Sequence, residues 1–203
     1  MPTANDLAQA IERIAGRIDP IRDELNAADR HLGDGDTGMT VADVVAAWQA
    51  AAPALPPDVG AALLALGRET SRATGSSLGA VLAMGLSAAG RSVRGKDALA
   101  VPDIRVALAA ATAAITGRSG AAGGDKTILD SLLQIEAGLA AADPAATADP
   151  LAVATGAAEA ALSEFRPREA RIGRARMYGA KSAGHDDPGM LAACLLLRAA
   201  APG

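Results

Sequence analysis

The sequence predicts an all-α fold of about eight short helices. Half of the 203 residues are hydrophobic, and alanine, the best helix former, supplies most of that fraction. Aromatic residues, which favour strands, make up only 1% of the chain. Apolar residues also recur every three or four positions along much of the sequence, which is the period of an amphipathic helix. Mostly short loops join these segments, and short loops favour antiparallel neighbours.

The first predicted helix spans residues 4–27. Its apolar residues follow the helical period and are Leu7, Ile11, Ile14, Ile18, Ile21 and Leu25. Pro20 lies inside this range. Because proline lacks the N–H that a helix interior needs, we expect it to kink or divide the helix.

Seven further helices are predicted along the rest of the chain. Val41, Val44 and Trp48 indicate a second helix, which ends before the prolines at 53, 56 and 57, and Asp58 is expected to cap a third that runs to about residue 71. The others are predicted over residues 80–89 or from 76, from 102, from 128, over 151–165 and over 190–200. Asp143-Pro144 and Asp149-Pro150 bracket a linker, and residues 173–189 are expected to form one long loop.

Three carboxylates gather in the segment 28–40. Asp29, Asp34 and Asp36 are expected in one short loop, where glycines allow tight turns that would aim them at one point. Such a cluster repels itself unless a cation lies between the carboxylates, and all-oxygen ligands suggest Mg²⁺ or Ca²⁺. An EF-hand calcium loop is disfavoured, because Val45 stands at the twelfth position counted from Asp34. A plain Asp-Gly turn that binds nothing stays open as the alternative.

Two glycine-containing segments invite comparison with phosphate-binding loops. Residues 90–97 resemble a P-loop, but Asp97 replaces the Ser or Thr that binds Mg²⁺, so we interpret them as a basic interhelical loop. Residues 117–127 lead into the sixth helix. Free N–H groups and the positive end of the helix dipole would suit phosphate there, although the same sequence is equally compatible with a turn capped by Asp125.

The polar loops precede every second predicted helix. In a regular up-and-down array, alternate connections lie at the same end of the molecule. We therefore expect the loops that contain Asp34, Thr74, Asp125 and Asp187 to share one rim.

Composition narrows the function classes. We expect residues 1–203 to form a single domain. A net charge of −4 and three aromatic residues argue against nucleic-acid binding, and no apolar run is long enough for a membrane span. The N-terminus lacks the pattern of a signal peptide, and the lone Cys194 fits a reducing compartment, so a cytoplasmic location is expected.

The loop motifs together resemble the L subunit of dihydroxyacetone kinase (DhaL) and the equivalent nucleotide domain of ATP-dependent dihydroxyacetone kinases. The resemblance spans essentially the whole chain. It rests on Asp29 with Gly33–Gly38, on Ala73–Gly75, on Gly124–Thr127, and on Gly173–Ala175 with Gly184–Gly189. It implies a barrel of eight antiparallel helices with a nucleotide, ADP or ATP, and two Mg²⁺ at one end.

The resemblance also implies roles for individual residues. Asp29, Asp34 and Asp36 match metal ligands, and no catalytic residue of this chain is assigned. The positions that match nucleotide-binding residues are Thr37, Gly38, Met39, Thr40, Ala73, Thr74, Ser119, Ile128, Arg174, Asp187, Pro188 and Gly189. The chain departs from the family pattern in having Thr37 and Thr40 where His or Asn is common. His185 is expected either to structure its loop or to support a neighbouring site residue.

By resemblance, the chain passes phosphate from its nucleotide to a short ketose such as dihydroxyacetone. The ketose would be held on a separate K subunit, for which 203 residues leave no room. Either an M subunit of a phosphoenolpyruvate-dependent phosphotransferase system recharges bound ADP, which a separate L chain favours, or ATP is consumed directly. The alternatives are a kinase component for another small sugar, a nucleotide-loaded regulatory partner, and a helical protein with an incidental Asp loop.

Overall fold

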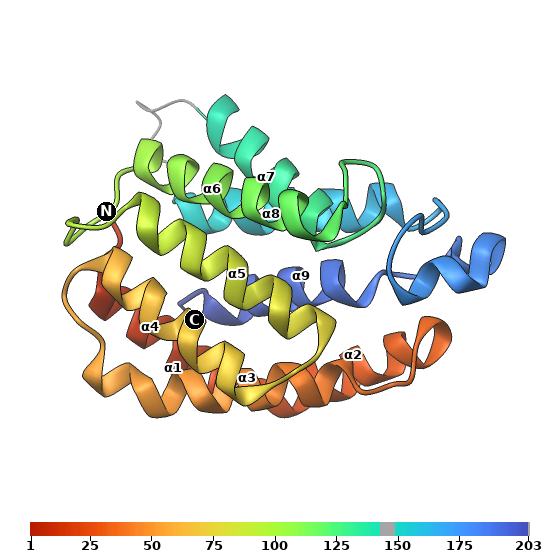
Figure 1. The fold of residues 1–203 in the computed structure, drawn as a ribbon, viewed down its shortest axis with the longest axis horizontal. Helices are drawn as coiled ribbons and strands as arrows, with labels where there is room; N and C mark the ends of the chain where they lie inside the picture. Colours follow the sequence, from red (N-terminus) through yellow and green to blue (C-terminus); the bar gives the residue numbers. More distant parts are fainter. Residues whose placement is uncertain (143–148, 203) are drawn as a thin grey trace.

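The computed structural model describes residues 1–142 and 149–202, which form nine α-helices and two 3-10 segments (Figure 1). The helices are α1 (Ala4–Ala15), α2 (Ile18–Leu32), α3 (Thr37–Ala51), α4 (Val59–Ala73), α5 (Ser77–Ser92), α6 (Val101–Ser119), α7 (Ile128–Ala141), α8 (Pro150–Phe165) and α9 (Pro188–Ala200), with 3-10 segments η1 (Ala52–Ala54) and η3 (Arg174–Ser182). No strand occurs among these residues, and the all-α prediction is confirmed. The Asp143-Pro144 part of the predicted linker lies outside the described residues.

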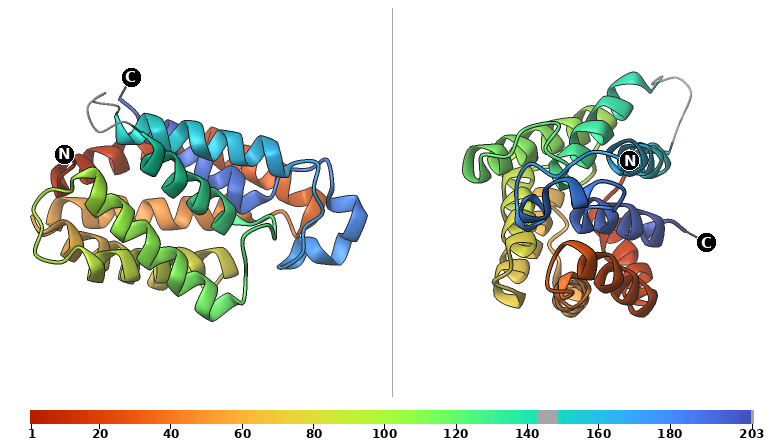
Figure 2. Two further views of the ribbon diagram at one scale, coloured as in Figure 1. Left: turned by 90° about the horizontal axis from the view of Figure 1, so that it is seen from above. Right: turned by 90° about the vertical axis from the view of Figure 1, so that its right-hand side faces the viewer.

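Eight of the helices close a barrel. From α2 to α9, each helix packs on the next along the chain, and α9 returns to pack on α2. The remaining helix, α1, packs on α3 and α9. Figure 2 shows that both termini lie towards one end of the long axis, while the segment around η3 projects at the other end. The predicted barrel of eight helices is therefore observed.

The predicted first helix is divided, but not at Pro20. The break falls at Gly16 and Arg17, and Pro20 lies in the first turn of α2, where a missing N–H breaks no helical hydrogen bond. As a result α2 runs on to Leu32. Asp29 is therefore a helical residue, and the prediction that all three carboxylates belong to a loop was wrong for this one.

Side-chain caps explain where several other helices begin. The Asp58 carboxylate accepts the Ala61 N–H at 2.7 Å and starts α4, as predicted. Ser76 caps α5 in the same way, which selects the earlier of the two predicted starts. The second predicted helix, marked by Val41, Val44 and Trp48, is α3 and begins at Thr37. The long loop after α8 is partly ordered as η3, so it is not one irregular loop.

Small residues let the helices pack closely. Where α4 meets α5, a Cβ on Gly60 would lie 2.5 Å from the Gly90 carbonyl oxygen, and one on Gly90 would lie 2.6 Å from the Gly60 carbonyl oxygen. Trp48, the one tryptophan, donates its indole N–H to the buried Thr70 hydroxyl at 2.8 Å. This packing makes the barrel a firm support for the loops at its end. None of the described helices combines the length and apolar character needed to cross a membrane.

Candidate functional site

Four loops at one end of the barrel enclose a cavity of about 230 Å³. These are the connections before α3, α5, α7 and α9, as the alternation of the chain predicted. The first residues of these four helices, Thr37, Ser77, Ile128 and Pro188, all line the cavity. Four positive helix ends therefore converge on one space, which favours a negatively charged ligand.

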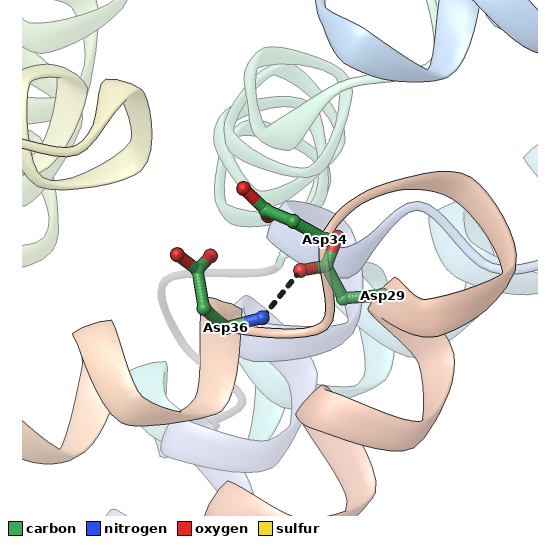
Figure 3. Close-up of side chains that lie close together, drawn as sticks. All are labelled: Asp29, Asp34 and Asp36. Atoms are coloured by element: carbon green, nitrogen blue, oxygen red, sulfur yellow. Dashed lines mark hydrogen bonds between the residues drawn. The ribbon is translucent and has the colours of Figure 1, made fainter.

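The three aspartates meet at the α2–α3 side of this cavity (Figure 3). Each offers a carboxylate oxygen, and these atoms all lie within 4.8 Å of one another. Asp29 is only 6% exposed, and its Oδ2 accepts the N–H groups of Gly35, Asp36 and Thr37 at 3.0, 3.0 and 3.2 Å. This carboxylate thus shapes the loop that carries the other two.

Gly33 is required by the same arrangement. Its backbone is extended, a conformation that any residue adopts. However, a Cβ at this position would lie 2.2 Å from Asp29 Oδ1. Only glycine leaves room for the carboxylate where the loop turns away from α2.

Charge inside the cluster is unevenly distributed. The Arg174 guanidinium, from η3, forms an ion pair with Asp34 and lowers the pKa of that carboxyl. The pKa of Asp36 is raised, first by burial and then by the Asp34 carboxylate beside it. Asp36 stands at the N-cap position of α3 without making a side-chain cap bond, so its oxygens stay available.

These residues fit a hard divalent cation. Their carboxylate oxygens lie within 4.8 Å of one another, and a cation between them would neutralise the repulsion of neighbouring carboxylates. Carboxylates with no sulfur or imidazole ligand are the donors that Mg²⁺ prefers.

The predicted nucleotide-binding residues fall into two groups. Seven of them line the cavity together with the aspartates: Thr37, Thr40, Ile128, Arg174, Asp187, Pro188 and Gly189. The other five lie outside its lining: Gly38, Met39, Ala73, Thr74 and Ser119. Their assignment to the nucleotide stays a prediction.

Local contacts of this second group are structural. Gly38 donates its N–H to Asn26 Oδ1 at 2.8 Å, and a Cβ there would lie 2.0 Å from the Arg22 carbonyl oxygen. Thr74 accepts the Ser76 N–H at 3.1 Å, and the Ser119 hydroxyl donates to the Ile115 carbonyl at 2.7 Å. Met39 is half exposed.

The glycine-rich loop before α7 has the features of a capped turn, the second of its two interpretations. Several of its N–H groups bond within the protein: those of Gly124 and Thr127 donate to the buried Asp130 at 2.5 and 2.8 Å, and that of Ala122 donates to Asp125 at 2.8 Å. The cap of α7 is Thr127 rather than Asp125. Of this loop, Thr127 is the residue that borders the cavity, followed by Ile128 of the helix.

Asp187, which lines the cavity, and the buried Lys126 both have shifted pKa values. Asp187 caps α9 by accepting the Met190 N–H at 2.9 Å, and burial raises its pKa to about 6 although this bond and the charge of Lys126 oppose the shift. Lys126 is fully buried at a φ of 63°, a left-handed conformation that costs a non-glycine residue on the order of 1 kcal/mol. Burial lowers the pKa of Lys126, and Asp187 and Asp186 oppose this.

Sequence reasoning missed the apolar part of the cavity. Leu78 and Val81 of α5 and Ile172 line it together with the aspartates. The two α5 residues follow a predicted helix start, where their apolar character indicated core. The sequence also left two roles open for His185, namely to structure its loop or to support a neighbouring site residue. The ring of His185 stacks on His31 with centroids 4.7 Å apart, which ties the loop before α9 to the end of α2 and fits the loop-structuring role.

Comparison with known proteins gives a consistent result. A model of the DAK2 domain family matches residues 31–202. The human triokinase/FMN cyclase is 35% identical over 201 residues, which are 95% of this chain and 34% of that protein. An L-erythrulose 1-kinase of Mycolicibacterium smegmatis is 34% identical over 87% of this chain and 31% of its own length. The chain thus spans about a third of the length of these relatives.

Two further matches concern a shorter relative and a solved structure. The ADP-binding subunit DhaL of the PEP-dependent dihydroxyacetone kinase of Escherichia coli is 24% identical, over 86% of this chain and 84% of that protein. The crystal structure of the C. freundii dihydroxyacetone kinase in complex with AMP-PNP and Mg²⁺ superposes with a TM-score of 0.73 and 26% identity, over 98% of this chain and 34% of that one. The fold and the resemblance noted from the sequence are confirmed.

Proposed function

Since the chain belongs to the DAK2 domain family, we propose that it is the nucleotide-binding phosphotransfer unit of a kinase for short ketoses. The observation that carries this proposal is the cavity with two opposite electrostatic features. Three carboxylates on one side suit divalent cations, and four helix N-termini suit a polyphosphate. A magnesium nucleotide is the ligand that satisfies both.

Asp29, Asp34 and Asp36 would hold two Mg²⁺. When bound, such ions neutralise the charge that develops on a phosphoryl group during transfer. The chain itself supplies position: Asp29 fixes the loop, the helix ends orient phosphate oxygens, and Arg174 lies close enough to the cluster to contact the phosphates once cations occupy Asp34. Leu78, Val81 and Ile172 offer an apolar surface for the base.

The ketose is proposed to come from a separate binding unit. Relatives carry names such as triokinase, L-erythrulose 1-kinase and D-erythrulose kinase, which are kinases of three- and four-carbon sugars. We assign no ketose pocket to this cavity. The K-type unit that holds the sugar is either a separate subunit or another part of a longer polypeptide.

The surface around η3 is the proposed docking site for that unit. Met177 is 85% exposed and Tyr178 is 39% exposed, and both belong to η3. Arg176 and Lys181 belong to the same segment, and we propose them as the charged contacts.

The phosphoryl donor is proposed to be ATP or, through an M subunit, phosphoenolpyruvate. The E. coli relative is named for the second route, whereas the relatives above 30% identity are about three times as long as this chain. A cytoplasmic location fits the single cysteine, which is buried and free. Neither a nucleic acid nor a membrane is a proposed partner.

Calorimetry with Mg²⁺ and ADP or ATP tests the proposal. We expect saturable binding with Mg²⁺ and much weaker binding when a chelator removes it. At a nucleotide concentration about a hundredfold above Kd, the stabilisation should be roughly 2.7 kcal/mol. Equal binding with and without Mg²⁺ would contradict the assignment of the aspartates. Binding without turnover, when a ketose-binding unit and ketoses are supplied, would instead favour the regulatory alternative.

A further inference from the structure

Lys126 makes contacts that join distant parts of the chain. Its side chain is fully buried, and its Nζ donates to the carbonyl oxygens of Arg166, Arg168 and Ser182 at 3.1, 2.7 and 2.8 Å. An amine that donates three hydrogen bonds is an ammonium group. The three acceptors flank the segment 166–184, two at its start and one near its end.

Further hydrogen bonds join the two ends of this segment, residues 166–170 and 182–184, which we call the neck. The Gly184 N–H donates to the Arg166 carbonyl oxygen at 2.8 Å. The same oxygen also accepts a hydrogen bond from Lys126 Nζ. The Ala170 N–H donates to the Ser182 hydroxyl at 2.9 Å. Between these bonds the chain leaves the barrel and forms the projection visible in Figure 1. The neck therefore fixes where the projection starts and ends.

Arg174 depends on this projection for its place. It is the first residue of η3, and its side chain is 62% exposed, so few neighbours hold it directly. Beside it, the buried Ala175 packs with Ala170 against Leu32 at the end of α2. The backbone of the segment, rather than side-chain packing around the guanidinium, sets the distance from Arg174 to Asp34.

We propose that Lys126 is a positioning residue whose buried ammonium closes the neck of the segment 166–184 and so holds Arg174 at the acidic side of the cavity. The consequence for nucleotide binding rests on the function proposed above. The neck itself is a property of the chain alone, so it is tested separately.

Proteolysis of the nucleotide-free protein tests the neck. Trypsin has cleavage sites inside the segment at Arg171, Arg174 and Arg176. In Lys126→Met, which keeps the length of the side chain but removes the charge, we expect these bonds to be cut about tenfold faster, because the segment opens locally without global unfolding. Lys96→Met is the matched control: Lys96 pairs with Asp103 away from the cavity, and its removal should leave the cleavage rates unchanged. Equal cleavage in both variants would overturn the proposal.

A double-mutant cycle tests the link to Arg174. Mg·ADP affinity would be measured for Lys126→Met, for Arg174→Ala and for the double variant. If Lys126 acts by placing Arg174, each single variant should weaken Mg·ADP binding by about tenfold. The double variant should then bind Mg·ADP as tightly as the single variant that has the lower affinity. Independent, multiplicative losses would show that Lys126 acts in another way and would overturn the positioning role.

Ser182→Ala keeps the experiment decisive if Lys126→Met does not fold. It removes the hydroxyl that accepts the Ala170 N–H but leaves the buried ammonium and its three carbonyls in place. Relative to the unmodified protein, we expect faster cleavage after Arg174 and weaker Mg·ADP binding. Unchanged cleavage in Ser182→Ala would contradict a neck that controls the segment. Failure of the unmodified protein to bind Mg·ADP would refute the proposed function, while the cleavage rates would still decide the neck.

Discussion

Replacing Gly33 by alanine should disable the acidic cluster without changing any charge. The new Cβ would lie 2.2 Å from Asp29 Oδ1 and 3.0 Å from its Cγ, well inside van der Waals contact. The Asp29 carboxylate cannot simply turn away, because its other oxygen accepts three backbone N–H groups at 3.0 to 3.2 Å. Either these bonds or the path of the loop must give way.

The size of the effect follows from those bonds. A hydrogen bond to a charged group contributes about 1.5–3 kcal/mol when it is removed from a partly buried site. The loop borders water, which replaces part of the loss. We therefore expect Gly33→Ala to lower the free energy of unfolding by about 2–4 kcal/mol, and to abolish most of the stabilisation by Mg·ADP because Asp34 and Asp36 move with the loop.

Chemical denaturation with and without Mg·ADP measures both effects. Gly156→Ala is the matched control, because Gly156 is an exposed residue inside α8 and a Cβ there meets nothing within 4 Å. Higher helix propensity should make that variant more stable by about 0.5–1 kcal/mol, with its Mg·ADP response intact. If Gly33→Ala were as stable as the unmodified protein and bound Mg·ADP equally well, the role assigned to the Asp29 loop would be wrong.

Three further outcomes are expected. Asp36→Asn should fold normally, because it removes a charge that burial and the neighbouring Asp34 carboxylate disfavour, yet it should weaken Mg·ADP binding by about a hundredfold in calorimetry; unchanged affinity would remove Asp36 from the metal site. Asp187→Asn keeps the α9 cap. Because the folded-state pKa of Asp187 is raised to about 6, the unmodified nucleotide-free protein should lose stability as pH rises from about 4 to 6. The variant should therefore melt at a higher temperature than the unmodified protein at pH 7.5 but not at pH 4. The chain alone, with Mg·ATP and short ketoses, should show no useful turnover in a coupled assay, and robust turnover would require a sugar site within it.

Much of the fold could be predicted because its signals are local. Apolar periodicity, the caps at Asp58 and Ser76, and the alternation of polar loops depend on residues close in sequence, and together they place four loops at one end. The position at which the first helix divides could not be predicted in the same way. A proline breaks a helix in its interior but not in its first turn, so the effect of Pro20 depends on where α2 begins. That start is set by the break at Gly16 and Arg17 rather than by the proline.

The residues of the site also differ in whether local sequence signals could predict them. Asp34 and Asp36 could be predicted to converge, because glycines surround them within a few residues. Lys126 could not, because its three carbonyl partners lie 40 to 56 residues away and its sequence neighbours indicate an exposed loop. The internal bonds of the glycine-rich loop before α7 could not be predicted for a related reason. Glycine-rich spacing indicates that N–H groups are accessible to a ligand, but not that a buried Asp130 already accepts them.

The charges at the cavity imply that the binding of a cation and the binding of an anion would be coupled. Without a cation, Arg174 pairs with Asp34, so one cluster carboxylate and the guanidinium neutralise each other. A divalent cation that binds Asp34 competes for that carboxylate, and the guanidinium is then free for an anion. A polyphosphate arriving alone would meet helix N-termini that attract it and carboxylates that repel it. If the cavity binds a magnesium nucleotide as proposed, cation and nucleotide should strengthen each other's binding, and by linkage the effect would be reciprocal. We therefore expect a cavity with both charges to prefer the magnesium complex over free nucleotide.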